Sequence, residues 1–375
     1  MTGAIVGDAR TRAPRKAARL LIGAAISLLA MIIIGAGGAL AWRAVLQHRN
    51  AEMFAIRDPR GIAEARFVRL GGVDQWVTIR GRDRGNPVLL MVGGDGAGIG
   101  ATMSPLTRTF LPWERDFTVV TWDMRGAGKS FQRAGRTLGE NASVGRIAAD
   151  GIELSEHLRT RLHKRKIVLL GASFGSTVAV RMAEARPDLY SAYVAAYQVA
   201  GSRPERERFF YRRLEGLVRT KGDPSEIAAL RYSGPDPLRD PKAAPGIYKV
   251  AARYRPPNPT DQTRQVLTHP DWSVADAMAI RAGYAASDRR LLAAWDATDW
   301  ETLGSRLSIP VIVIQGADND IAPLAMTEAW LARVPAPLKV VAAIPGAGGH
   351  AMETHNAAFL QQLDRLVRPL AVAAQ

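Results

Sequence analysis

The chain has 375 residues, a length compatible with two or three domains or with one α/β domain that carries an insertion. Its composition, with 47% apolar and 23% charged residues and no cysteine, excludes a disordered chain, disulfides, a thiol nucleophile and cysteine-ligated metals. The net charge of +15 is spread along the chain without a basic–aromatic cluster, so we expect no nucleic-acid partner.

The N-terminus predicts a membrane anchor. Residues 1–19 form a basic tail, and residues 20–42 carry no charged side chain. As a helix, this apolar run extends about 34 Å, enough to cross a hydrocarbon core of ~30 Å. The positive-inside rule places the tail in the cytoplasm and the bulk of this single-pass protein on the extracytoplasmic side. A cleaved signal peptide is the alternative, because Ala39-Leu40-Ala41 resembles a small-residue cleavage site.

Strand-like and helix-like segments alternate through the rest of the chain. Two runs on either side of Gly71-Gly72 predict a β-hairpin. Short apolar runs typical of strands buried on both faces occupy residues 87–92, 117–122, 166–170, 311–314 and 339–344. Helical periodicity marks residues 144–162, 324–334 and 356–367. This alternation predicts an α/β protein with a mostly parallel sheet and helices on both faces.

The same pattern predicts the domain organisation. A linker over residues 43–62 would follow the transmembrane helix. The α/β core would comprise residues 63–198 and 301–375. Residues 199–300 are polar and contain several prolines, which interrupts the alternation, so we expect a helical cap inserted between two core strands.

One short motif points to a nucleophile. Gly171-Ala172-Ser173-Phe174-Gly175 follows the strand-like run 166–170 and precedes a helix-like stretch. A G-x-S-x-G sequence between a strand and a helix is typical of a nucleophile elbow, a sharp turn that raises the serine hydroxyl above the sheet. The glycines leave room for close backbone, and the following helix directs its N-terminus at the reacting oxygen. We therefore predict Ser173 as the nucleophile of an acyl-enzyme.

Several motifs over residues 65–370 resemble those of the α/β-hydrolase family, in particular its prolyl-aminopeptidase-like branch. Besides the elbow they are VGGDG at 92–96, WDMRGAGKS at 122–130, GPDPLRD at 234–240 and GAGGH at 346–350. The resemblance implies an α/β-hydrolase fold and a serine hydrolase, either a prolyl-type aminopeptidase or an esterase. It also implies that the 122–130 segment builds a rigid turn with a structural role.

A serine hydroxyl needs a base to take its proton. His350 follows the predicted strand 339–344 through a glycine-rich loop, and the order Ser–acid–His matches this fold, so we predict His350 as the base. The resembled family has its acid at the position of Asn319, which Asp318 and Asp320 flank. We expect one of these carboxylates, with Asp320 favoured, to orient the imidazole. Orientation by the Asn319 amide, as in Cys-His-Asn proteases, is the alternative.

Acyl transfer develops negative charge on the carbonyl oxygen, which backbone N–H groups stabilise. We expect one donor from Phe174, the residue after the nucleophile, and, by resemblance, a second from Gly94. Neither a metal nor a dissociable cofactor is expected, because the histidines are scattered and no H-E-x-x-H sequence is present.

These features predict a membrane-anchored serine hydrolase that cleaves an ester or amide bond of a small-molecule or peptide substrate. The alternative is a non-catalytic, membrane-tethered binding module on a hydrolase scaffold, which Asn319 motivates. Glutamates alternate with arginines in the cap, a pattern typical of a solvated helix face, so no substrate-binding residue is predicted there.

Overall fold

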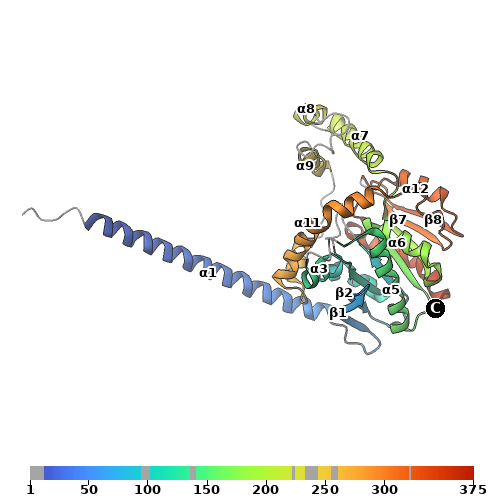
Figure 1. Cartoon of the computed structure of the whole chain (residues 1–375), viewed down its shortest axis with the longest axis horizontal. Helices are drawn as coiled ribbons and strands as arrows, with labels where there is room; N and C mark the ends of the chain where they lie inside the picture. Colours follow the sequence, from blue (N-terminus) through green and yellow to red (C-terminus); the bar gives the residue numbers. More distant parts are fainter. Residues whose placement is uncertain are drawn as a thin grey trace, which may run out of the picture. The chain divides into compact units, whose positions relative to one another are not determined.

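The computed structural model describes residues 12–93, 102–135, 141–221, 224–232, 244–254, 261–320 and 322–375. The chain divides into two compact units. The first is the N-terminal segment to Met53 with Thr268–Pro270, and the second comprises Phe54–Leu267 and Asp271–Gln375 and contains the whole sheet (Figure 1).

The first unit is built on helix α1, Arg12–Phe54. Its segment Leu20–Phe54 is long and apolar enough to cross a membrane, with a mean hydropathy of 2.5 and 0% of that apolar window buried. A membrane anchor and a signal sequence both meet this criterion. Residues 43–54 of the expected linker are helical, because they contain no glycine or proline and include several strong helix formers.

Eight strands form one sheet in the order β1-β2-β4-β3-β5-β6-β7-β8. Their bounds are β1 Ile62–Leu70, β2 Val73–Gly81, β3 Val88–Val92, β4 Thr118–Asp123, β5 Ile167–Ser173, β6 Tyr190–Gln198, β7 Val311–Gly316 and β8 Lys339–Ile344. Strand β2 pairs antiparallel with β1 and β4, and the other pairs are parallel. The mostly parallel sheet and the hairpin at Gly71-Gly72 are therefore confirmed, with β1 and β8 at opposite edges (Figure 1).

Two strands differ from the sequence prediction. Strand β6 is buried along its whole length and was not predicted, because Val194 is the only β-branched residue among its alanines and tyrosines. Strand β8 was predicted to be buried on both faces, which is wrong. It lies at the sheet edge, and Lys339, Val341 and Ala343 are exposed on one face while Ala342 and Ile344 are buried on the other.

Helices cover both faces of the sheet, as two separate apolar clusters demonstrate. One cluster joins the strands to α5 (Val144–Leu162), α6 (Phe174–Ala185) and α12 (Leu324–Arg333). The other joins the opposite face to α2 (Thr107–Phe110), the 3₁₀ turn Leu111–Arg115 and α14 (Asn356–Gln362). In this second cluster Trp113 stacks on Phe359, with ring centroids 5.5 Å apart. A π-helical turn, Leu363–Val367, and α15, Arg368–Ala373, end the chain.

The segment between β6 and β7 is helical. Its helices are α7 Arg203–Lys221, α8 Pro224–Tyr232, α9 Ala244–Tyr254, α10 Gln262–Thr268 and α11 Val274–Asp296. Helices α7, α8 and α9 bury an apolar cluster of their own, which includes Phe210, Leu214, Val218, Leu230 and Ile247. Helix α11 instead packs on α3 (Gly128–Ala134) and contributes to the core beside α6.

Candidate active site

The turn from β5 to α6 has the geometry expected of a nucleophile elbow. Ser173 ends the strand with φ 52° and ψ −126°, a conformation that a residue with a side chain adopts only under strain of about 1–3 kcal/mol. A Cβ atom at Gly175 would lie 2.0 Å from the carbonyl oxygen of Val92, and one at Gly171 would lie 2.8 Å from Cα of Ser176. The close approach of β3 and α6 to the turn therefore requires both glycines.

We expect Gly175→Ala to destabilise the fold by about 1–3 kcal/mol or more, because the atom that the new methyl group meets is backbone and cannot move aside. Gly216→Ala is the matched control. It adds the same methyl group inside helix α7, where nothing lies within 4 Å, and should raise stability by about 0.5–1 kcal/mol. Thermal unfolding of both variants measures the difference. Equal stability of Gly175→Ala and wild type would contradict the close approach of β3.

Ser173 and His350 line the same cavity, whose volume is about 520 Å³. His350 lies in the loop after β8 and directly precedes α13, Ala351–Thr354. The two residues lie on segments that are distant in sequence, and the fold brings them to one site, at the end of β5 and in the loop that follows β8.

Two residues beside His350 were missed by the sequence prediction. The ring of Tyr197 packs edge-on against the imidazole, with centroids 6.4 Å apart. Its hydroxyl donates to the Glu353 carboxylate over 2.6 Å and accepts the Met352 N–H over 2.7 Å. Tyr197 also has a positive φ of 54°, a strained conformation found most often at functional sites. Glu353 follows His350 on the next helical turn, but nothing in the sequence marks Tyr197.

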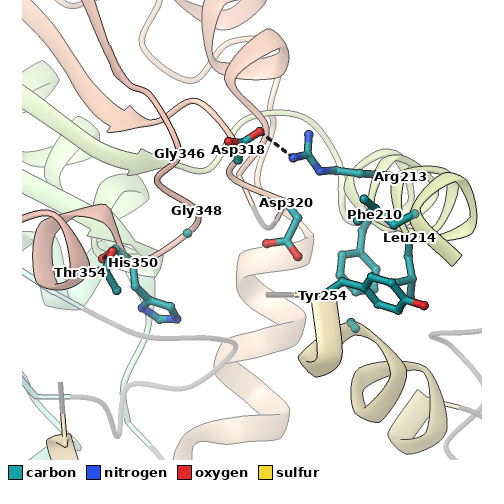
Figure 2. A pocket seen from close by; sticks show the side chains of 13 residues that line it. Phe210, Arg213, Leu214, Tyr254, Asp318, Asp320, Gly346, Gly348, His350 and Thr354 are labelled. Atoms are coloured by element: carbon teal, nitrogen blue, oxygen red, sulfur yellow. Dashed lines mark hydrogen bonds and ion pairs between the residues drawn. The ribbon is translucent and has the colours of Figure 1, made fainter. Parts of the chain in front are cut away.

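The three candidate orienting residues have different surroundings. The Asp318 carboxylate is 55% exposed and accepts a hydrogen bond from Arg213 of α7 over 2.9 Å. Asn319 is buried, and its side-chain oxygen accepts the Ala322 N–H over 2.9 Å, so the amide stabilises its own loop. Figure 2 shows the Asp320 side chain extending toward the side of the loop where His350 lies, while Asp318 turns toward Arg213.

A second cavity of about 220 Å³ shares His350 with the first as a lining residue. Asp318, Asp320 and the Gly346–His350 loop form one wall, and Phe210, Leu214 and Tyr254 of the cap form the other (Figure 2). His350 therefore lines both the cavity that contains Ser173 and the cavity that contains the two carboxylates.

Of the two predicted oxyanion donors, Phe174 lies among the residues that the structure describes. Phe174 is the first residue of α6, and its buried ring contacts Trp295 of α11 edge-on at 5.5 Å. Gly94 lies outside the described residues. In the part of the chain that the structure describes, no group of three His, Asp or Glu side chains is placed to hold a metal ion.

The segment 122–130 forms a turn held by buried polar contacts. Asp123 is fully buried and accepts the Lys129 N–H over 2.9 Å and a hydrogen bond from the Thr102 hydroxyl. Arg125 forms an ion pair with the buried Asp150 over 2.9 Å. These contacts agree with the structural role that the family resemblance implies, and burial raises the pKa of Asp123 to about 7.

This raised pKa predicts a pH dependence of stability. In an unfolded chain the Asp123 carboxyl titrates near ~4, so between about pH 4 and 7 the folded protein holds a proton that the unfolded chain lacks. The free energy of unfolding therefore falls as pH rises through this window, by at most about 1.4 kcal/mol per pH unit. Asp123→Asn cannot titrate, so its Tm should decline less than that of wild type between pH 5 and 7. Parallel Tm curves for the two proteins would contradict the raised pKa.

Comparisons with known proteins agree with this architecture. A family described as serine aminopeptidase, S33, matches residues 110–214. The chain is 25% identical over 292 residues to the probable aminopeptidase YbaC of Bacillus subtilis (strain 168), which covers 76% of this chain and 90% of that protein. Two solved structures share the fold. A membrane phospholipase A has a TM-score of 0.58 at 17% identity, over 94% of this chain and 98% of its own. A proline iminopeptidase-related protein of Thermus thermophilus has a TM-score of 0.53 at 20% identity, over 84% and 100%.

The strand order, the elbow and these structural neighbours show that the chain has the α/β-hydrolase fold. The family match and the aminopeptidase relatives indicate that the protein is a serine hydrolase, and they are similar to it in the way that the resemblance to the prolyl-aminopeptidase-like branch implies. The fold class and the enzyme class predicted from the sequence are thereby confirmed.

Proposed function

We propose that the protein is a membrane-anchored hydrolase that cleaves an ester or amide through an acyl-enzyme on Ser173. The observation that carries this proposal is the strained elbow serine that shares one cavity with His350. Helix α1 would hold the enzyme in the membrane, with residues 1–19 in the cytoplasm and the catalytic domain on the extracytoplasmic side.

In this mechanism His350 takes the proton of the Ser173 hydroxyl as the oxygen attacks the substrate carbonyl carbon. The N–H of Phe174, with that of Gly94, stabilises the oxyanion. The imidazolium then protonates the leaving group, and the acyl-enzyme forms. A water molecule, deprotonated by the same imidazole, releases the acid and restores the serine. Asp320 would orient the ring and stabilise its positive charge.

The cap carboxylates bear on the choice between aminopeptidase and esterase. An aminopeptidase needs an acceptor for the ammonium group of its substrate. Among the residues of the cap that the structure describes, all four glutamates have a local partner: Glu205 accepts from Ser202, and Glu207, Glu215 and Glu226 pair with arginines. Ester cleavage is therefore the favoured activity. Aminopeptidase activity, which the name of the YbaC relative suggests, is the second candidate.

A fluorophosphonate probe and two substrates test the proposal. We expect the full-length protein to be labelled at Ser173 and to hydrolyse p-nitrophenyl butyrate faster than proline 2-naphthylamide. The reverse order of rates would assign it as an aminopeptidase. Absence of Ser173-dependent labelling would favour the non-catalytic binding module. Extraction of membranes at alkaline pH tests the anchor, because a cleaved and released domain would leave the membrane fraction.

A further inference from the structure

One face of helix α11 forms a wall of the cavity that contains Ser173 and His350. Val274, Ala277, Met278 and Arg281 all line that cavity. Their spacing of three, four and seven residues from Val274 places them on one side of the helix, in a row about 10 Å long. The wall is therefore apolar along two turns and ends in a guanidinium group.

The mouth of this cavity is apolar as well. Leu267, Val274 and Met278 line it and are 38%, 43% and 69% exposed. Large apolar side chains that remain exposed around a catalytic cavity are typical of a binding surface for the apolar part of a ligand. A volume of about 520 Å³ accommodates a medium-length acyl chain or a ligand of similar size.

The charged side chains that line this cavity differ in whether they have a partner within the protein. Besides His350, the lining residues whose side chains are charged at neutral pH are Arg281 and Glu353. The Glu353 carboxylate accepts a hydrogen bond from Tyr197, next to the imidazole. Arg281 is exposed, and its guanidinium has no ion pair or hydrogen bond among the residues that the structure describes. The group in this cavity that is available to a ligand is therefore cationic.

We propose that Arg281 determines specificity by binding a negatively charged group, so that the substrates are amphiphilic esters with an apolar acyl chain that carries a carboxylate or a similar anion. This inference rests on the proposed function. A guanidinium group forms charge-assisted, bidentate hydrogen bonds with carboxylates, which supplies both affinity and orientation. The apolar row from Val274 to Met278 contacts the chain, and Arg281 binds the charge beyond it. An ammonium group at the same place would be repelled.

Matched esters test this proposal. The substrates are p-nitrophenyl monoesters of butanedioic, hexanedioic and octanedioic acid, each beside the neutral ester of the same chain without the terminal carboxylate. We expect Arg281→Gln to lower kcat/KM about tenfold for at least one diacid monoester and to leave the neutral esters within about twofold. Arg281→Glu should lower kcat/KM for the diacid monoesters further, and Arg281→Lys should retain part of the wild-type activity on them. The preference of the wild-type enzyme for the diacid monoesters over the neutral esters should weaken as the NaCl concentration is raised.

The control variant is Arg212→Gln, which removes an exposed arginine of helix α7 that lines neither cavity. It should leave all kinetic constants unchanged. The neutral esters report whether each variant is folded and active. Equal effects of Arg281→Gln on charged and neutral esters, or no effect on either, would overturn the role of Arg281. Failure of wild type to hydrolyse any ester, with no labelling of Ser173, would instead overturn the proposed function.

Discussion

Replacement of Ser173 by alanine is expected to lower kcat for p-nitrophenyl butyrate by about 10⁶-fold, the loss typical when a serine hydrolase loses its nucleophile. Without the hydroxyl no acyl-enzyme forms, and only binding and oxyanion stabilisation remain to accelerate direct attack by water. Fluorophosphonate labelling should disappear as well. Ser202→Ala is the control, because this hydroxyl lies before helix α7, donates to Glu205 and lines neither cavity.

The loss in His350→Ala should approach that in Ser173→Ala, and the double variant should be little worse than either single variant. Residues that act as one unit show this lack of additivity. Additive losses would indicate that the serine and the histidine act independently, which would contradict their assignment to one proton-transfer pair.

Asp320→Asn is expected to lower kcat by about 10⁴-fold, because an amide can no longer stabilise the imidazolium and favours the wrong tautomer of the ring. Asp318→Asn should lower kcat by less than about tenfold. Its carboxylate is exposed and pairs with Arg213, so its removal disturbs one contact of the cap and leaves the imidazole in place. Steady-state kinetics of the two variants at pH 7 separate these outcomes.

The two carboxylates are a matched pair, since each substitution exchanges one oxygen for an amide nitrogen in the same loop. Losses of similar, small size in both variants would contradict the assignment to Asp320 and would point to Asn319. In that event Asn319→Ala should abolish activity, although the buried amide also stabilises the loop through the Ala322 N–H, so its Tm must be measured in parallel.

Much of the fold follows from local pattern. The run 166–170, the G-x-S-x-G sequence and the helix after it form one strand–turn–helix unit, and each part is short-range in sequence. The helix predicted over residues 144–162 is α5, with Ile147, Leu154 and Leu158 buried on one face. The predicted burial of strand β8 was wrong because the sequence shows how apolar a segment is, whereas the position of that segment at the sheet edge depends on the strand order.

The residues of the candidate site could be predicted from the sequence only where they belong to a recognisable local motif. Ser173 and His350 lie in recognisable loops. Tyr197 reaches the imidazole because β6 lies beside β5, a long-range pairing that leaves no local trace in the sequence. The pairing of Asp318 with Arg213 likewise depends on how the cap helix packs over the loop after β7, which residue spacing does not encode. The orienting carboxylate therefore stayed ambiguous at the level of sequence.

The separate apolar cluster of helices α7, α8 and α9 has an evolutionary consequence. Because Phe210, Leu214 and Ile247 pack among cap residues, substitutions on these helices perturb contacts that are largely independent of the two clusters that hold the sheet. Relatives of this enzyme can therefore diversify the cap and acquire new ligand preferences while the hydrolytic scaffold retains its stability. Exchange of the α7–α9 segment between such enzymes is accordingly a practical route to new selectivity.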